Sequence, residues 1–115
     1  DELLNVAPFV RVRLLKASSQ LGWLENCKAL SRVRGLSLSY SHLNDLSVAR
    51  LASLPRLEGL RVLLLDHNFI RSRGALELAH SLYLSGLKRL DLRGNQFTTA
   101  GRQALVDRFG PAVHL

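Results

Sequence analysis

Two histidines and two aspartates are the side chains of this chain that could carry out acid–base chemistry or bind a metal. Asp66 and His67 are adjacent in the sequence, and His42 and Asp91 lie on either side of them. Catalysis would require a nucleophile or metal ligands that converge with these groups, and the close spacing of a built metal site is missing. The chain also has no glycine-rich loop of the kind that cradles phosphate. The sequence therefore predicts a protein without catalytic residues, metal or other cofactor.

A repeat of 27 residues organises the chain and decides where these side chains lie. In the stretch "LKRLDLRGNQFTTAG" at 87–101, the leucines, the asparagine and the last glycine come 27 positions after equivalent residues in 60–74. Leucines recur at this spacing outside the motif in two series: Leu24, Leu51, Leu78 and Leu105, and Leu30, Leu57 and Leu84. Four leucines in one register are hard to produce by composition alone, so we interpret the chain as a repeat protein.

The first unit joins this register with one residue fewer. Val10 aligns with Leu36 at a spacing of 26, which places the missing residue in the turn 13–20. The chain starts at Asp1 and contains no methionine, so we interpret it as a fragment of a longer protein. We expect residues 1–115 to form one domain, made of the end of a preceding helix at 1–7, about four strand–turn–helix repeats of 26–27 residues at 8–108, and a C-terminal tail at 109–115.

Each repeat combines a strand pattern with a helix pattern. Alternating leucines point to one side of a short strand, and the following segments, such as "ALELAHSLYL", carry apolar residues at steps of three and four. Asn68 and Asn95, with Ser41 at the equivalent position, can satisfy turn backbone that leaves the sheet. Repeats bury their leucines against their neighbours. The sequence therefore predicts an α/β solenoid with a parallel sheet on the concave side and helices on the convex side.

The same motifs resemble leucine-rich repeats of the ribonuclease-inhibitor type. The stretches "LRVLLLDHNFIRSRGALELAHSL" and "LKRLDLRGNQFTTAGRQAL" follow the pattern LxxLxLxxNxIxxxGxxxL, although the second repeat has Ser41 in place of the asparagine. The opening "APFVRVRLL" and the closing "RFGPAVHL" are similar to the C-terminal repeats of large bacterial leucine-rich-repeat proteins that carry an N-terminal companion domain. The resemblance implies a non-catalytic module that binds another protein through its concave face.

The outward positions of the strands define this expected binding face. Leu64 is notable because its equivalents in the neighbouring repeats are polar, so the core does not require a leucine there. With Tyr40 and His67 it would form an amphipathic spot bordered by arginine and aspartate, a composition typical of protein-contact sites. The candidate partner-binding residues are Arg11, Arg13, Ser37, Tyr40, Leu64, Asp66, His67, Arg89, Asp91 and Arg93.

The net charge of +7 raises the question of nucleic-acid binding. The arginines are distributed around the expected solenoid, and only Tyr40 and Phe69 would offer stacking surfaces, which is too few for a base-stacking platform. We therefore expect an unidentified protein as the partner. The alternatives are a basic nucleic-acid-binding surface and a purely structural repeat array within a larger protein.

The sequence also bears on the surroundings of the protein. No apolar run approaches the ~18 residues of a membrane span, so we expect no membrane association. The single Cys27 cannot form an internal disulfide, and a free thiol favours a reduced, cytoplasmic setting. The first repeat lacks a neighbour on one side, so we expect the isolated fragment to be prone to self-association through its N-terminal edge.

Overall fold

The computed structural model describes residues 9–12 and 17–115. The helix end expected at 1–7 and the candidate residue Arg13 lie outside these ranges. The strands and α-helices are, in chain order, β1 (Phe9–Arg11), α1 (Ala17–Glu25), β2 (Gly35–Ser37), α2 (Asp45–Ala52), β3 (Val62–Leu64), α3 (Ser72–Ala79), β4 (Arg89–Asp91), α4 (Thr99–Phe109) and β5 (Val113–His114). Short 3-10 helices lie at η2 (Lys28–Arg32), η3 (Pro55–Gly59) and η4 (Gly110–Ala112).

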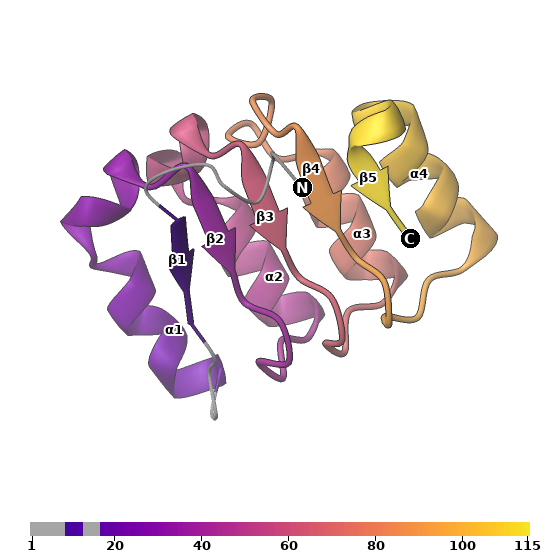
Figure 1. Ribbon diagram of the computed structural model, residues 1–115. Coiled ribbons are helices and arrows are strands. Elements are labelled where there is room, and N and C mark those ends of the chain that lie inside the picture. Colours follow the sequence, from indigo (N-terminus) through magenta and orange to yellow (C-terminus); the bar gives the residue numbers. More distant parts are fainter. Residues whose placement is uncertain (1–8, 13–16) are drawn as a thin grey trace.

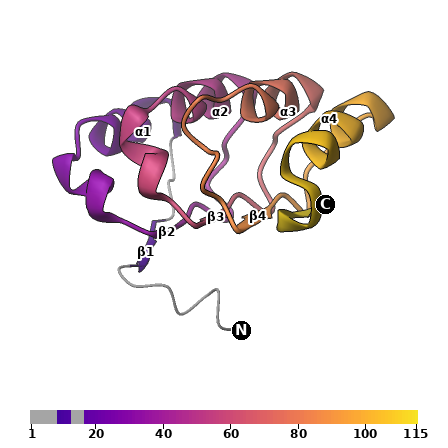
Figure 2. The ribbon, with the colours of Figure 1, turned by 90° about the horizontal axis from the view of Figure 1, so that it is seen from above.

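The strands form one five-stranded sheet in the order β1-β2-β3-β4-β5, and each neighbouring pair is parallel (Figure 1). The four α-helices all lie on the same face of this sheet, as the view from above shows (Figure 2). The structure thus confirms the α/β class and the parallel sheet. We call the opposite face, which presents Arg11, Ser37, Leu64 and Asp91, the helix-free face.

Strand pairing follows the spacing of the sequence repeat. Leu36 pairs with Leu63 and Leu63 with Leu90, an offset of 27 positions each time. Val10 pairs with Leu36, an offset of 26, so the missing residue of the first unit does not disturb the sheet. Leu36, Leu63 and Leu90 are fully buried because these strand positions point toward the helices. Equivalent residues of successive units therefore stack on one another through the core.

The helices contribute the other half of this core through equivalent leucines. Members of the two leucine series are at most 2% exposed: Leu24, Leu51, Leu78, Leu105, Leu30, Leu57 and Leu84. Close helix packing also requires a small residue at Gly74, where a Cβ atom would lie 2.6 Å from Oδ1 of Asp45. The start of α2 is fixed by Asn44, whose side chain accepts a 2.9 Å hydrogen bond from the Ser47 amide. These contacts fix the start of α2 and pack the start of α3 closely against it.

The segment 109–115, expected as a tail, contributes to the fold. After α4 the chain passes Gly110, whose φ of 56° is in the left-handed region, and forms η4. It then adds β5 to the sheet, with Val113 paired to Leu90 and His114 to Asp91. Val113 and Leu115 also pack against the core. The last residues therefore extend the parallel sheet beyond the fourth unit.

Candidate functional site

Polar side chains follow one another across the helix-free face. The Ser39 hydroxyl donates a 2.5 Å hydrogen bond to Asp66 and lies 3.2 Å from the Ser37 hydroxyl. On the next strand, the guanidinium of Arg93 donates to both carboxylate oxygens of Asp91, at 3.0 and 2.7 Å. This paired geometry is the strong form of an arginine–carboxylate contact. The candidate residues of this face are therefore largely bonded to one another.

Asp91 is the most strongly held of these groups. Its carboxylate also accepts the Arg93 amide at 3.1 Å and lies 3.9 Å from the guanidinium of Arg89. Burial opposes ionisation of this carboxyl, but the hydrogen bonds from Arg93 and the charges of Arg93 and Arg89 outweigh burial and hold the pKa of Asp91 below its ordinary value. Asp91 therefore carries its negative charge in a position that is only 4% exposed.

Leu64, predicted to form an amphipathic spot with Tyr40 and His67, is largely enclosed by its neighbours. The residue is only 8% exposed, and Ser37, predicted to lie beside it on the binding face, is 5% exposed. Leu64 lies on the third of five strands, between Ser37 and Asp91 in the register, so neighbouring strands crowd it on both sides. Leu64 therefore offers little exposed area, and its role in partner binding stays a prediction. Arg11 is exposed, with its guanidinium 5.0 Å from the centre of the Phe9 ring.

The more unusual geometry lies at the turn edge, where the strands lead into the turns before the helices (lower edge of the sheet in Figure 1). Tyr40 and His67 both have φ of 55°, and Gly94, one repeat further on, has φ of 77°. The left-handed region is favourable for glycine but costs about 1–3 kcal/mol for other residues. Gly94 shows that this turn can form without a side chain. Tyr40 and His67 therefore adopt a backbone conformation that is unfavourable for residues with a side chain.

Four rings at the turn edge, Tyr40, His67, His42 and Phe69, form what we call the aromatic ladder. Tyr40 and His67 are stacked with ring centres 4.6 Å apart and planes inclined by 10°. His42, which also has a positive φ of 58°, stacks on Phe69 at 5.8 Å. Tyr40 is 53% and Phe69 65% exposed. The ladder is therefore a set of paired rings turned toward solvent.

Asparagine side chains hold the turns beneath these rings. Oδ1 of Asn68 accepts hydrogen bonds from the amides of Ser41 and Leu43 at 2.9 and 3.0 Å, and its Nδ2 donates to Leu38 and Leu65 carbonyls at 3.0 Å. Each asparagine thus joins its own turn to the turn of the preceding repeat. The equivalent bonds of the next repeat are made by Asn95, which accepts from Ile70 and donates to Leu65 and Leu92.

Ser41 occupies the same position with a shorter side chain. Its hydroxyl lies 3.4 Å from the Val12 carbonyl and 3.3 Å from the Ser39 carbonyl. The Nδ2 group of Asn68 lies 3.0 Å from the Leu38 and Leu65 carbonyls and 3.3 Å from the Asp66 carbonyl. A hydroxyl has one hydrogen to donate, whereas an asparagine amide donates two and accepts as well. Asn68 of the following repeat supplies two further hydrogen bonds to the second turn, by accepting from the amides of Ser41 and Leu43.

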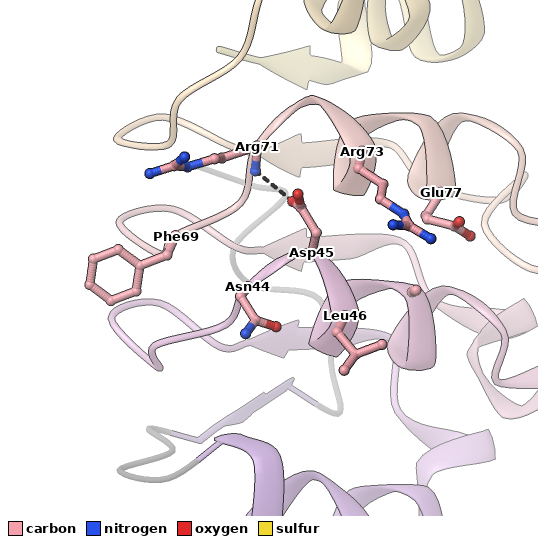
Figure 3. Close-up of a pocket in the computed structure, with 8 residues that line it drawn as sticks. Asn44, Asp45, Leu46, Phe69, Arg71, Arg73 and Glu77 are labelled. Carbon is pink, nitrogen blue, oxygen red and sulfur yellow. Dashed lines mark hydrogen bonds between the residues drawn. The ribbon is translucent and has the colours of Figure 1, made fainter.

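A groove of about 710 Å³ runs from the aromatic ladder along the starts of α2 and α3. Phe69 and Arg71 form its rim and point away from the helices, and Leu46, which is 73% exposed, lies on its other side (Figure 3). The backbone N–H of Arg71 donates a 2.7 Å hydrogen bond to Asp45, which leaves the guanidinium of Arg71 directed to solvent (Figure 3). Arg73 lines the same groove. Apolar and cationic groups thus adjoin the ladder.

The residues considered first for chemistry are not brought into one site. His67 stacks on Tyr40 and His42 on Phe69, whereas Asp91 is held by Arg93 and Asp66 by a serine hydroxyl. Within residues 9–12 and 17–115, no group of three or more histidine, cysteine, aspartate or glutamate side chains is placed to hold a metal ion. No helix in that part of the chain has the length and apolarity to cross a membrane.

Sequence reasoning included Tyr40 and His67 among the candidates and named Phe69 as a stacking surface, but it did not place His42, Phe69 and Arg71 on one surface with them. Those three residues lie beyond the strand, where alternation no longer tells which way a side chain points. A usable signal was present, because Gly94 occupies the position of Tyr40 and His67 and indicates a left-handed turn.

Comparison with protein-family models and with curated proteins finds no match for this chain.

Proposed function

We propose that the chain is a leucine-rich-repeat array of the ribonuclease-inhibitor type that binds a protein partner through its turn edge. Support for the repeat array comes from the strand register, since Leu36, Leu63 and Leu90 stack at the repeat spacing. The equivalent asparagines Asn68 and Asn95 make equivalent bonds to the preceding turn, which also supports it. A parallel sheet with all helices on one face fits a solenoid of this type.

The observation that carries the binding proposal is the conformation of Tyr40 and His67. Both residues accept a left-handed backbone and expose stacked rings at a position that Gly94 fills without strain elsewhere in the chain. Strain of this kind persists where the surrounding structure enforces it and is concentrated at functional sites. Large, rigid aromatic side chains are enriched in the centres of protein interfaces because they bury much area at little entropic cost.

A nucleic-acid surface has less support from the geometry. The arginines of the helix-free face would have to neutralise phosphates, but Arg93 and Arg89 both lie against Asp91. Asp66 adds a further negative charge on that face. A phosphate groove would instead require cations that are free to contact the backbone of the nucleic acid. We therefore favour a protein partner over the nucleic-acid alternative.

The proposal is tested with a Tyr40→Gly, His67→Gly double variant, because glycine suits the left-handed backbone and should preserve the fold. A partner identified by capture from a lysate of the source cell would be purified, and its affinity measured by calorimetry. We expect the double variant to bind at least tenfold more weakly, since aromatic hot-spot residues contribute about 2 kcal/mol or more each.

The matched control is Leu82→Ser, which removes an apolar side chain that is 81% exposed and lies away from the turn edge. This variant should bind as well as the wild type. Equal affinity of the double glycine variant and the wild type would contradict the proposal. So would binding of an oligonucleotide whose affinity falls steeply with salt while the protein partner fails to bind.

A further inference from the structure

Arg71 is the point at which three hollows of the surface meet. It lines the groove between α2 and α3, a hollow of about 330 Å³ with Phe69 and Gln96, and another of about 490 Å³ with Arg73 and Phe97. Phe69 lines the first two of these. We call these two side chains, which point away from the helices, the Phe69–Arg71 ridge (Figure 3). Phe69 also belongs to the aromatic ladder, so the ridge and the ladder adjoin.

Arg71 of the ridge and its neighbour Arg73 differ from other arginines of the chain in what their guanidinium groups contact. The guanidinium of Arg93 donates hydrogen bonds to Asp91, and that of Arg108 donates to a backbone carbonyl of α3. The guanidinium groups of Arg71 and Arg73 make no hydrogen bond or ion pair with any residue the structure describes. Both side chains are exposed. Their charges are therefore available to a ligand.

Acidic side chains lie on only one side of the ridge, so the positive charges of Arg71 and Arg73 are not compensated on the other side. Asp45 and Glu77 line the groove between α2 and α3, and Asp45 is bonded to the Arg71 backbone. The two hollows on the α4 side have no acidic residue among the side chains that line them, whereas Arg71 lines both and Arg73 lines one. The local charge is thus positive on the side that faces Gln96.

We propose that the Phe69–Arg71 ridge binds an acidic peptide segment of the protein partner. Carboxylates of the segment would lie against Arg71 and Arg73 on the α4 side, and an adjacent apolar or aromatic side chain would pack on Phe69, which is 65% exposed. Arginine suits this role because its planar fork pairs with carboxylates and its face packs on rings. The inference rests on the proposed function and adds the chemistry of the partner.

A protein ligand fits this ridge better than a phosphate backbone does. A nucleic acid gains affinity from many phosphate contacts in a row, and only Arg71 and Arg73 are placed as cations around the hollows. Phe69 and Leu46 are instead 65% and 73% exposed, so they add apolar area to the groove that Arg71 and Arg73 also line. Protein interfaces combine apolar and arginine side chains in this way.

A random peptide library displayed on phage, selected on the immobilised protein, tests the inference without a known partner. We expect the selected peptides to be enriched in aspartate and glutamate next to an aromatic or aliphatic residue. Synthetic copies of these peptides should bind Arg71→Gln, Arg73→Gln protein about tenfold or more weakly, because each lost charged hydrogen bond is worth at least that factor. The charge-matched control, Arg32→Gln with Arg102→Gln, should bind as the wild type does.

The outcomes separate this inference from the function on which it rests. Peptides without acidic enrichment that lose affinity in the Tyr40→Gly, His67→Gly variant would overturn the acidic ligand and leave the turn-edge interface standing. Acidic peptides that bind Arg71→Gln, Arg73→Gln protein undiminished would also overturn it. A single-stranded oligonucleotide that binds more tightly than the selected peptides, in a manner that depends on Arg71, would replace the peptide by nucleic acid and contradict both proposals.

Discussion

Replacing Asn68 with alanine should destabilise the protein more than the equivalent change in either neighbouring repeat. The Asn68 side chain is 5% exposed, and its oxygen is the acceptor for the amides of Ser41 and Leu43, two residues that are fully buried. Alanine would leave both amides without this acceptor. A buried polar group that loses its partner costs about 1–3 kcal/mol, so two of them give about 2–6 kcal/mol.

The same reasoning ranks the other two positions. Asn95 accepts from one amide, that of Ile70, so Asn95→Ala should cost about 1–3 kcal/mol. The hydroxyl contacts of Ser41 with the Val12 and Ser39 carbonyls are long, at 3.4 and 3.3 Å, so Ser41→Ala should cost about 0.5–1.5 kcal/mol. Asn44→Ala controls for the substitution itself, because the exposed Asn44 only caps α2 and its loss should cost about 1 kcal/mol.

Urea denaturation followed by circular dichroism would measure the four variants against the wild type. A constant slope with urea would show that the midpoint shifts report stability alone. The reasoning would be refuted if Ser41→Ala were the most damaging change. It would equally be refuted if Asn68→Ala remained within about 1 kcal/mol of the wild type, since that is the lower limit for one lost partner.

Four further substitutions test other parts of the structure by the same unfolding assay. Leu78 is fully buried, so Leu78→Ala should cost about 2–5 kcal/mol, and a loss below about 1 kcal/mol would contradict its place in the core. The pKa of Asp91 is lowered from 3.8, because the hydrogen bonds from Arg93 outweigh burial. Because the folded pKa lies below the ordinary one, the stabilisation by Asp91 is complete above the ordinary value and is lost as the pH falls through the folded pKa. The stability gap between wild type and Asp91→Asn should therefore be widest at neutral pH and shrink as the solution is acidified. A gap independent of pH would contradict the pairing. Gly94→Ala should cost about 1–3 kcal/mol because of its left-handed φ, whereas Gly22→Ala, in open space on a helix, should stabilise by about 0.5–1 kcal/mol; equal effects would contradict the turn geometry.

The spacing of leucines was sufficient to predict the sheet and its register. Leu36, Leu63 and Leu90 must be buried, and only a parallel arrangement of successive units places them side by side at a spacing of 27. The fifth strand was not predictable in this way. Val113 and His114 follow no repeat spacing, and a two-residue strand has no alternation to recognise, so its pairing depends on where α4 ends.

The candidate site could be predicted only in part. Alternation along the strands correctly separated Ser37, Leu64 and Asp91 from the core-facing leucines, but it could not tell how tightly neighbouring strands enclose them. Exposure depends on contacts between units, which the sequence of one unit does not describe. The direction of the rings of Tyr40 and His67 depends on the φ angle of the turn, and hydrophobic periodicity contains no information on that angle.

If Tyr40 and His67 are displayed for binding, the turns should not depend on their rings for stability. The free energy of unfolding of the Tyr40→Gly, His67→Gly variant measures this dependence. Relief of left-handed strain, about 1–3 kcal/mol for each residue, offsets the loss of ring stacking, about 0.5–1.5 kcal/mol, and the greater freedom of unfolded glycine, about 0.5–1 kcal/mol for each residue. Summed over both residues, these terms predict a stability between about 1.5 kcal/mol below and about 4.5 kcal/mol above that of the wild type. A loss of more than about 3 kcal/mol, the cost of removing a core aromatic ring, would show that the rings hold the turns together and would contradict the claim.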